Sequence, residues 1–306
     1  MRVNLRTVAF GLALALAASA QVSAAGVFIV SHKGVESFEG AKAGFIQMAY
    51  GLQLPGFNPK AIELDGSAGD DSALAALAAQ NPSLVFAVGS TAAKKVRKVL
   101  PDVWIVYGMV YAPESEGLTA DPKMVGVTSL GPAKGLGTAL KAFTRSKAMT
   151  ILHTQAETAS LGPLLDRLKA EGYDVQTKAV AGPSDLQAAF DALKDQCKIL
   201  LLLPDALTAN QDAMRFLVSQ CVAAGILPVA LAEPLVGSGA LLASFYPPES
   251  VGNKAAKVAA DILKSGEAPA ERVVDPSDAS TALNQGTAKA LKLSIPKSLR
   301  VEVTYE

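Results

Sequence analysis

The chain has 306 residues, half of them apolar, and carries 28 basic and 28 acidic side chains. Such an apolar composition excludes an intrinsically disordered chain, and the charge balance gives no electrostatic reason to bind nucleic acid or an anionic membrane surface. The length is sufficient for one large domain or for two lobes with separate cores.

The first 25 residues have the pattern of a signal peptide. Arg2 and Arg6 precede an apolar run at 7–20, and small residues at 22–25 fit a signal peptidase site. The run is shorter than the roughly 20 residues that span a bilayer, which favours cleavage over a membrane anchor. No cysteine lies near the cleavage point, which argues against a lipid anchor. We expect a secreted periplasmic protein whose net charge after cleavage is 26 − 28 = −2, because the removed stretch holds two arginines and no acid.

Short β-rich apolar runs alternate with longer amphipathic runs from residue 26 to about residue 231. This alternation is typical of βαβ units, and strands that are apolar on both faces indicate a parallel sheet covered by helices. The expected strands are 27–30, 60–64, 84–88, 103–107, 124–128, 148–153, 175–180, 198–203 and 227–231. The expected helices are 38–51, 71–79, 91–100, 133–143, 158–170, 184–194 and 210–224.

The nine expected strands could form either one wide sheet or two smaller ones, and two features of the sequence favour two sheets. The segment 122–132 holds a strand and no helix, which suits a crossing between lobes, and the alternation stops at 233–240. A last apolar run at 241–246 then precedes one more helix at 251–264. We expect lobe one at 26–130 plus 240–266, and lobe two at 131–239 plus 267–306.

The chain has two cysteines, Cys197 and Cys221, and an exported protein can keep a disulfide. Cys197 lies at the start of an expected strand, and Cys221 lies in the last turns of the helix that follows. If this helix runs antiparallel to the strand, the two cysteines lie at the same end of the α/β layer. Closing this loop of about 25 residues would contribute roughly 3 kcal/mol. Two buried free thiols are the alternative, and the sequence leaves both open.

Motifs for catalysis and cofactor binding are missing. The chain has no G-x-S-x-G, P-loop, H-E-x-x-H or G-x-G-x-x-G sequence. The only histidines, His32 and His153, each end an expected strand, but a catalytic metal needs three protein ligands and no third is evident. We therefore expect no enzyme, no cofactor and no metal site.

Polar side chains gather at the ends of the expected strands, where α/β proteins bind ligands. At the start of the helix at 91–100, free backbone N–H groups at Gly89, Ser90 and Thr91 would suit an anion. The other candidates for ligand contact from lobe one are Ser31, His32, Tyr107 (with Tyr111 close by), Gly108, Met109, Thr128 and Ser129. From lobe two they are Thr154, Glu157, Asp205 and Glu233.

Several of these residues also have a structural interpretation. Ser90 or Thr91 could serve only to cap its helix, and Asp205 could cap the helix at 210–224. His32 and His153 are explained most simply as polar contacts of a cleft.

The last third of the chain resembles a known family. Pro228-Val229, Glu233, the run 239–247 and the helix at 255–266 are followed by the specific stretch Asn284 to Leu299. This order is similar to the substrate-binding proteins of ABC transporters, in the group that includes tryptophan- and tyrosine-binding members. More loosely, the resemblance extends over the chain after residue 25, since 126–129 is similar to the family's crossing between lobes.

The resemblance implies a type 1 periplasmic binding protein, an α/β fold in which two Rossmann-like lobes with parallel sheets are joined by a three-strand hinge. It also implies a ligand held between the lobes, with Thr154, Glu157, Ser160 and Asp205 at positions of ligand contact. The loops at 32–35 and 153–155 differ from those of amino-acid binders, so the resemblance does not name the ligand.

The leading hypothesis is a monomeric periplasmic protein that delivers a small polar or aromatic, amino-acid-like solute to the permease of an ABC importer. A different class is a periplasmic sensor that reports a ligand to a membrane kinase or receptor. A hydrolase that uses Asp205 or Glu157 with His153 is the third alternative. The genes beside this one would separate transport from sensing, and turnover of a ligand would indicate the enzyme.

Overall fold

The computed structural model describes residues 26–306. The signal peptide expected at 1–25 lies outside the described residues. Within 26–306, no helix is both long and apolar enough to cross a membrane.

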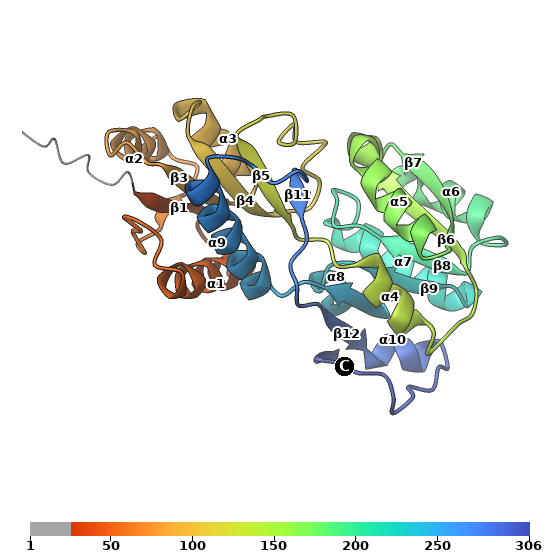
Figure 1. Cartoon of the computed structure of the whole chain (residues 1–306). Coiled ribbons are helices and arrows are strands. Elements are labelled where there is room, and N and C mark those ends of the chain that lie inside the picture. Colours follow the sequence, from red (N-terminus) through yellow and green to blue (C-terminus); the bar gives the residue numbers. More distant parts are fainter. Residues whose placement is uncertain (1–25) are drawn as a thin grey trace, which may run out of the picture.

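Residues 27–128, together with 248–274, build a six-stranded sheet in which every pair of neighbouring strands is parallel, in the order β11-β5-β4-β3-β1-β2. The strands are β1 (Val27–His32), β2 (Ile62–Leu64), β3 (Leu84–Val88), β4 (Trp104–Val110), β5 (Met124–Thr128) and β11 (Val273–Val274). The helices beside it are α1 (Glu36–Gly51), α2 (Gly69–Ala78), α3 (Ser90–Val99) and α9 (Pro248–Ser265). α1 and α9 share one apolar cluster with the sheet, and α2 and α3 share the other (Figure 1). We call this sheet and its helices lobe one.

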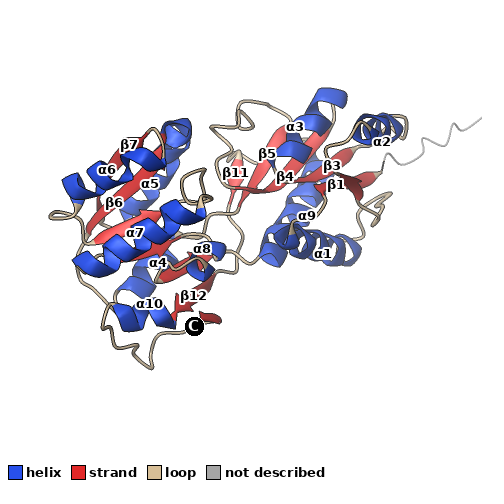
Figure 2. Cartoon of the chain, turned by 180° about the vertical axis from the view of Figure 1, so that it is seen from behind, coloured by secondary structure: helices blue, strands red, loops and turns tan. Residues whose placement is uncertain are grey.

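Residues 133–245, together with 280–305, build a seven-stranded sheet in the order β13-β12-β10-β9-β8-β6-β7, in which only the β10–β12 pair is antiparallel. The strands are β6 (Ala148–Thr154), β7 (Asp174–Val180), β8 (Ile199–Leu202), β9 (Leu227–Ala230), β10 (Leu242–Phe245), β12 (Ser280–Asn284) and β13 (Val303–Tyr305). The α-helices are α4 (Ala133–Leu140), α5 (Leu161–Ala170), α6 (Leu186–Leu193), α7 (Gln211–Ala224), α8 (Pro234–Gly237) and α10 (Gln285–Ala290), and the 3-10 helices are η1 (Gln155–Ser160) and η2 (Pro183–Asp185). We call this unit lobe two; the two lobes lie side by side in Figures 1 and 2.

The α/β class with two mostly parallel sheets is confirmed, but strand pairing differs from the expected lobe boundaries at two places. β10, expected in lobe one, pairs with β9 and β12 in the second sheet. β11, expected in lobe two, pairs with β5 in the first sheet. An apolar run indicates a strand but not its neighbour, and β11 has only two residues, so the sequence could not assign either strand to its sheet.

Three segments cross between the lobes, after β5, after β10 and after β11. The first two crossings touch, because a Cβ built on Gly131 would lie 1.8 Å from the carbonyl oxygen of Ser244. On lobe one, a Cβ on Gly252 of α9 would lie 2.0 Å from the carbonyl oxygen of Ala41 in α1. Glycine at these two positions therefore lets backbones approach more closely than any side chain would allow.

Cys197 and Cys221 are both buried free thiols in one apolar cluster of lobe two. The alternative of two free thiols therefore describes this structure, and the disulfide is absent from it. Burial raises the pKa of both thiols. Thiols held protonated in this way are poor nucleophiles, which explains how they persist in the core.

Candidate functional site: a cleft between the two lobes

A cleft of about 430 Å³ is lined by both lobes beside the crossing segments. Lobe one contributes the loop after β4 and the residues just before β11, and lobe two contributes η1, α4 and α5. Its polar and charged lining residues are Tyr111, Glu114, Thr119, Thr128, Ser160, Arg167, Glu271 and Arg272. A concave site with a few polar groups among apolar ones is typical of small-molecule binding.

A smaller pocket adjoins the cleft and shares Tyr111, Leu130, Ser160 and Leu164 with it. It adds Glu157 and the loop after β8, at Pro204 and Asp205. Expected candidates from η1 and β8 therefore lie together at the inner edge of lobe two.

Direct contacts connect the lobes around this cleft. The hydroxyl of Ser160 in η1 accepts a hydrogen bond from the backbone N–H of Ser115 at 3.0 Å and lies 2.9 Å from the Ser115 hydroxyl. Arg167 of α5 pairs with Asp275 just after β11 at 3.1 Å. Because these contacts are polar and partly exposed, water can replace them at little cost in free energy. They are therefore compatible with a cleft whose two lobes move relative to each other.

Two carboxylates of lobe two lie near the cleft, Glu157 in the adjoining pocket and Glu233 close to Tyr111, whereas the charged residue of lobe two that lines the cleft itself is Arg167. Burial raises the pKa of Glu157, and the nearby charges of Asp205 and Glu116 raise it further. Burial also raises the pKa of Glu233, with Glu36 of lobe one adding to the effect. The raised pKa values mean that the ionised forms of Glu157 and Glu233 are disfavoured, and a cation placed beside them would stabilise these forms. The space beside these two carboxylates therefore suits an ammonium group.

The expected anion site at the start of α3 has the necessary backbone geometry. Gly89 is the N-cap with φ 91°, and no side chain caps the helix. The first N–H groups of a helix have no partner within it, so Ser90 and Thr91 present free donors. Ser90 is half-buried, Thr91 is exposed, and the ring of Phe38 would lie 2.7 Å from a Cβ on Gly89.

Two further expected residues end β1. Ser31 is fully buried, and its hydroxyl has no hydrogen-bond partner among the described residues. Its register partner in β3 is Val88, directly before Gly89. His32 is half-buried, with its Nδ1 atom 3.0 Å from the carbonyl oxygen of Lys33. An unsatisfied buried hydroxyl is uncommon and indicates a site that a ligand could complete.

The expectation that Tyr107, Gly108 and Met109 contact a ligand needs correction. Tyr107 is 1% exposed and packs in the apolar cluster beneath α2 and α3, where burial raises the pKa of its phenol. A Cβ on Gly108 would lie 2.8 Å from Val251 of α9, so this residue faces the helix layer. Met109 is buried in the cluster beneath α1 and α9, and Tyr111 is the tyrosine that lines the cleft.

The remaining candidates from the crossing and from β6 lie at or near the cleft. Thr128 lines it, whereas Ser129 is buried, with its hydroxyl 3.9 Å from the sulfur of Met109. Thr154 ends β6, and its hydroxyl is buried without a partner. Thr154 thus presents a second unused donor close to Glu157.

Asp205 has a structural role in lobe two. Its Oδ2 atom accepts from the backbone N–H of Thr154 at 3.0 Å. Its Oδ1 atom accepts from the N–H groups of Leu207 at 2.9 Å and Thr208 at 3.1 Å. Asp205 is 7% exposed, so its carboxylate ties the end of β6 to the loop after β8 and holds the cleft wall in shape.

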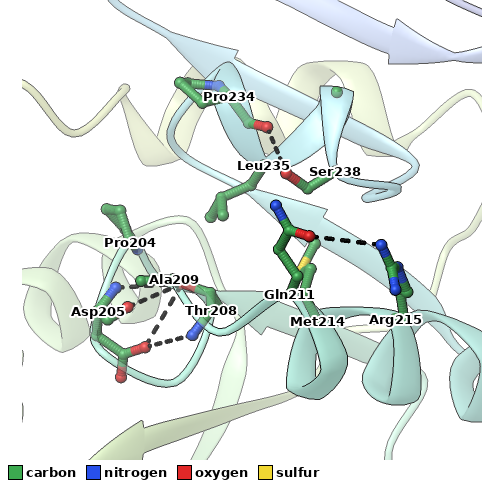
Figure 3. A pocket seen from close by; sticks show the side chains of 11 residues that line it. Pro204, Asp205, Thr208, Ala209, Gln211, Met214, Arg215, Pro234, Leu235 and Ser238 are labelled. Atoms are coloured by element: carbon green, nitrogen blue, oxygen red, sulfur yellow. Dashed lines mark hydrogen bonds between the residues drawn. The ribbon is translucent and has the colours of Figure 1, made fainter. Parts of the chain in front are cut away.

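A larger cavity, of about 630 Å³, lies beside the loop that Asp205 organises, between the first turn of α7 and α8 (Figure 3). All of its lining residues come from lobe two. A solute there would touch one lobe only, so we regard the smaller two-lobe cleft as the better candidate site.

Some cleft residues gave no signal in the sequence. Arg167 lies on a helix face that reads as solvated, and Arg272 follows a helix in a segment with no expected element. Arg272 also donates to the carbonyl oxygen of Pro122 at 2.8 Å. Only the pairing of β11 with β5, which joins residues far apart in the chain, brings Arg272 to the cleft.

Comparison with known proteins identifies the family. The model of the ABC transporter substrate binding protein family matches residues 27–305. The chain therefore belongs to this family, whose members bind solutes and are not enzymes.

The chain is similar to a tyrosine-binding protein of Clostridioides difficile, with 23% identity over 220 residues, or 69% of this chain and 63% of that protein. It also resembles the ligand-free, open structure of a substrate binding protein with adhesive properties from Clostridium difficile, with a TM-score of 0.69 and 18% identity over 92% of this chain and 99% of the other. A third similar structure is an ABC domain in complex with L-Trp from Streptococcus pneumonia, with a TM-score of 0.62 and 20% identity over 92% and 100% of the two chains. At these identities, the two structures establish the fold.

Proposed function

We propose that the protein is a periplasmic solute-binding protein that delivers an amino-acid-like solute to the permease of an ABC importer. The observation that carries this proposal is the cleft of about 430 Å³, lined by both lobes, in a chain of the substrate-binding family. The expected signal peptide supports periplasmic delivery, and we infer that the protein acts as a monomer.

The charges around the cleft support a zwitterionic solute. On lobe two, Glu157 and Glu233 are carboxylates whose raised pKa values would be relieved by an ammonium group. On lobe one, the free N–H donors of Ser90 and Thr91, which lie outside the lining of the 430 Å³ cleft, would receive a carboxylate when the lobes close. In this arrangement each lobe holds one end of the solute, so the solute favours the state in which the lobes are close together.

The other candidate residues complete the proposed site. Ser31 and Thr154 supply hydroxyl donors that have no partner in the described chain, and Tyr111 takes the place expected for Tyr107 as the aromatic contact. The further proposed contacts are His32, Thr128 and Ser129. Asp205 acts indirectly, by holding Thr154 in position.

The named ligands of similar proteins support the same class. One relative is a tyrosine-binding protein, and one structure of the same fold holds L-Trp. Another similar structure holds L-rhamnose, so the fold by itself does not select amino acids. The carboxylates near the cleft favour an amino acid, because an ammonium group would pair with their charge, whereas a neutral sugar would only donate hydroxyl hydrogen bonds to them.

Isothermal titration calorimetry tests the proposal with a panel of amino acids and sugars. We expect one amino acid to bind at one site per chain, and Glu157→Gln to weaken it by roughly tenfold or more because a charged hydrogen bond is lost. Asp212→Asn is the matched control, since Asp212 is fully exposed at the start of α7. Binding of a sugar with no response to any amino acid would contradict the proposal.

A further inference from the structure

A separate cavity of about 480 Å³ lies in lobe two where the crossing segments enter it. It is lined by α4, which follows the first crossing, by Ser244 of β10, which precedes the second, and by 279–281, which follows the third. The segment 298–300 closes the remaining side. We call it the hinge-root cavity, and it shares no lining residue with the two-lobe cleft.

Hydroxyl groups dominate its wall. Ser244 is 1% exposed, and its hydroxyl makes no hydrogen bond within residues 26–306. That hydroxyl lies against α4, since a Cβ on Gly135 would be only 2.3 Å from it. The hydroxyls of Ser280, Thr281 and Ser298 are likewise without hydrogen bonds in the described chain. Because these hydroxyls line the cavity and make no hydrogen bond to the described chain, they are available to donate to a ligand with several acceptor oxygens.

The charge around this cavity is positive, although the whole chain is neutral. Residues 122–156 contain five lysines or arginines and no acid, and residues 286–301 contain four and no acid. Lys141 and Arg300 from these two stretches line the cavity, and no aspartate or glutamate does. The nearby Glu302 pairs with Arg300 at 2.7 Å, and the next cavity along α4 adds Arg145 and Lys147 around Lys141.

We propose that the hinge-root cavity binds a phosphate group and that its occupancy restrains the crossing segments. Hydroxyl donors, the cation of Lys141, unpaired within residues 26–306, and the cation of Arg300, which would exchange its pairing with Glu302 for the ligand, match an oxyanion better than a neutral or cationic ligand. Because the wall includes residues beside all three crossings, a bound phosphate holds α4, β10 and β12 together at the base of the hinge. This site is distinct from the solute cleft and does not depend on the identity of the solute.

Titration of inorganic phosphate into the purified protein, followed by calorimetry, tests the site. We expect binding at one site per chain, weakened by roughly tenfold in Lys141→Gln because one charge-assisted hydrogen bond is lost. Ser244→Ala should also weaken it. Lys134→Gln is the matched control, since Lys134 is an exposed cation of the same helix that does not line the cavity. Absence of binding, or equal affinity in Lys141→Gln and the control, would overturn the site.

Two further arms distinguish the source of the phosphate and test the restraint. Sedimentation with vesicles that contain phosphatidylglycerol tests a lipid headgroup: binding that Lys141→Gln abolishes supports that source, and no binding leaves free phosphate as the ligand. Distances between spin labels at Lys98→Cys and Asp212→Cys, both exposed and on different lobes, should narrow in distribution with phosphate. The native thiols are buried and should not react with the label. If the distribution of spin-label distances is unchanged at saturating phosphate, the proposed restraint of the crossing segments is wrong.

Discussion

Replacing Asp205 should destabilise lobe two more than it changes the chemistry of the cleft. Its carboxylate accepts three backbone N–H groups, from Thr154, Leu207 and Thr208, at distances of 2.9 to 3.1 Å. At about 1 kcal/mol of net stabilisation for each bond, Asp205→Ala should cost about 3 kcal/mol. In Asp205→Asn the remaining side-chain oxygen can still accept from the N–H groups of Leu207 and Thr208, but the amide nitrogen faces the N–H of Thr154 and cannot accept from it. This variant should lose about half as much stability as Asp205→Ala.

Urea unfolding gives the magnitude, with hydrogen exchange of the Leu207 and Thr208 amides assigning the loss to lobe two, since two lobes need not unfold in one transition. Asp212→Asn is the control for loss of an exposed acid in the same lobe. A loss below about 0.5 kcal/mol for Asp205→Ala, within the range of ordinary surface substitutions, would refute the assignment of Asp205 as a clamp.

Four further expectations follow from the same geometry. Glu157→Gln should weaken solute binding but raise the stability of the solute-free protein at neutral pH, measured in thermal melts. The reason is that burial, Asp205 and Glu116 raise the pKa of Glu157, so its charge is unfavourable in the free protein. A loss of stability together with the loss of affinity would contradict this role. Solute affinity should fall as the pH drops through that raised pKa, because protonation removes the partner of the ammonium, whereas stability of the free protein should rise over the same interval; calorimetry and melts from pH 7 to about 4 measure the two signs. Gly252→Ala should cost about 1–3 kcal/mol in urea unfolding because its Cβ meets the Ala41 carbonyl, while Gly162→Ala, with no atom within 4 Å of its Cβ, should not destabilise the protein. Tyr107→Phe should leave solute affinity unchanged and not reduce stability, since its buried phenol has no hydrogen-bond partner; a tenfold loss of affinity would restore Tyr107 to the site.

The order of strands and helices could be predicted from the sequence because apolar periodicity reports local structure directly. β8 and β9, which are buried at every position, read as strands covered on both faces and lie in the interior of the second sheet. Which sheet a strand joins depends on contacts between residues that are distant in sequence. For this reason the predicted assignment of β10 to lobe one was wrong.

Side-chain direction limited the prediction of the site in a similar way. β4 is irregular between Tyr107 and Val110, and Met109 has φ 58°, so alternation along this strand does not give the direction of each side chain. Tyr107 therefore lies in the core and Tyr111 at the cleft. The start of the helix after Gly89 could be located to within one residue, because a glycine followed by hydroxyl residues after a buried strand is a local signal.

Native mass spectrometry of the protein purified from its own cells tests the central claim most directly. We expect one small solute per chain, with an ammonium and a carboxylate group, retained by the wild type and lost from Glu157→Gln. A chain that carries no solute, or a sugar retained equally by both proteins, would contradict it.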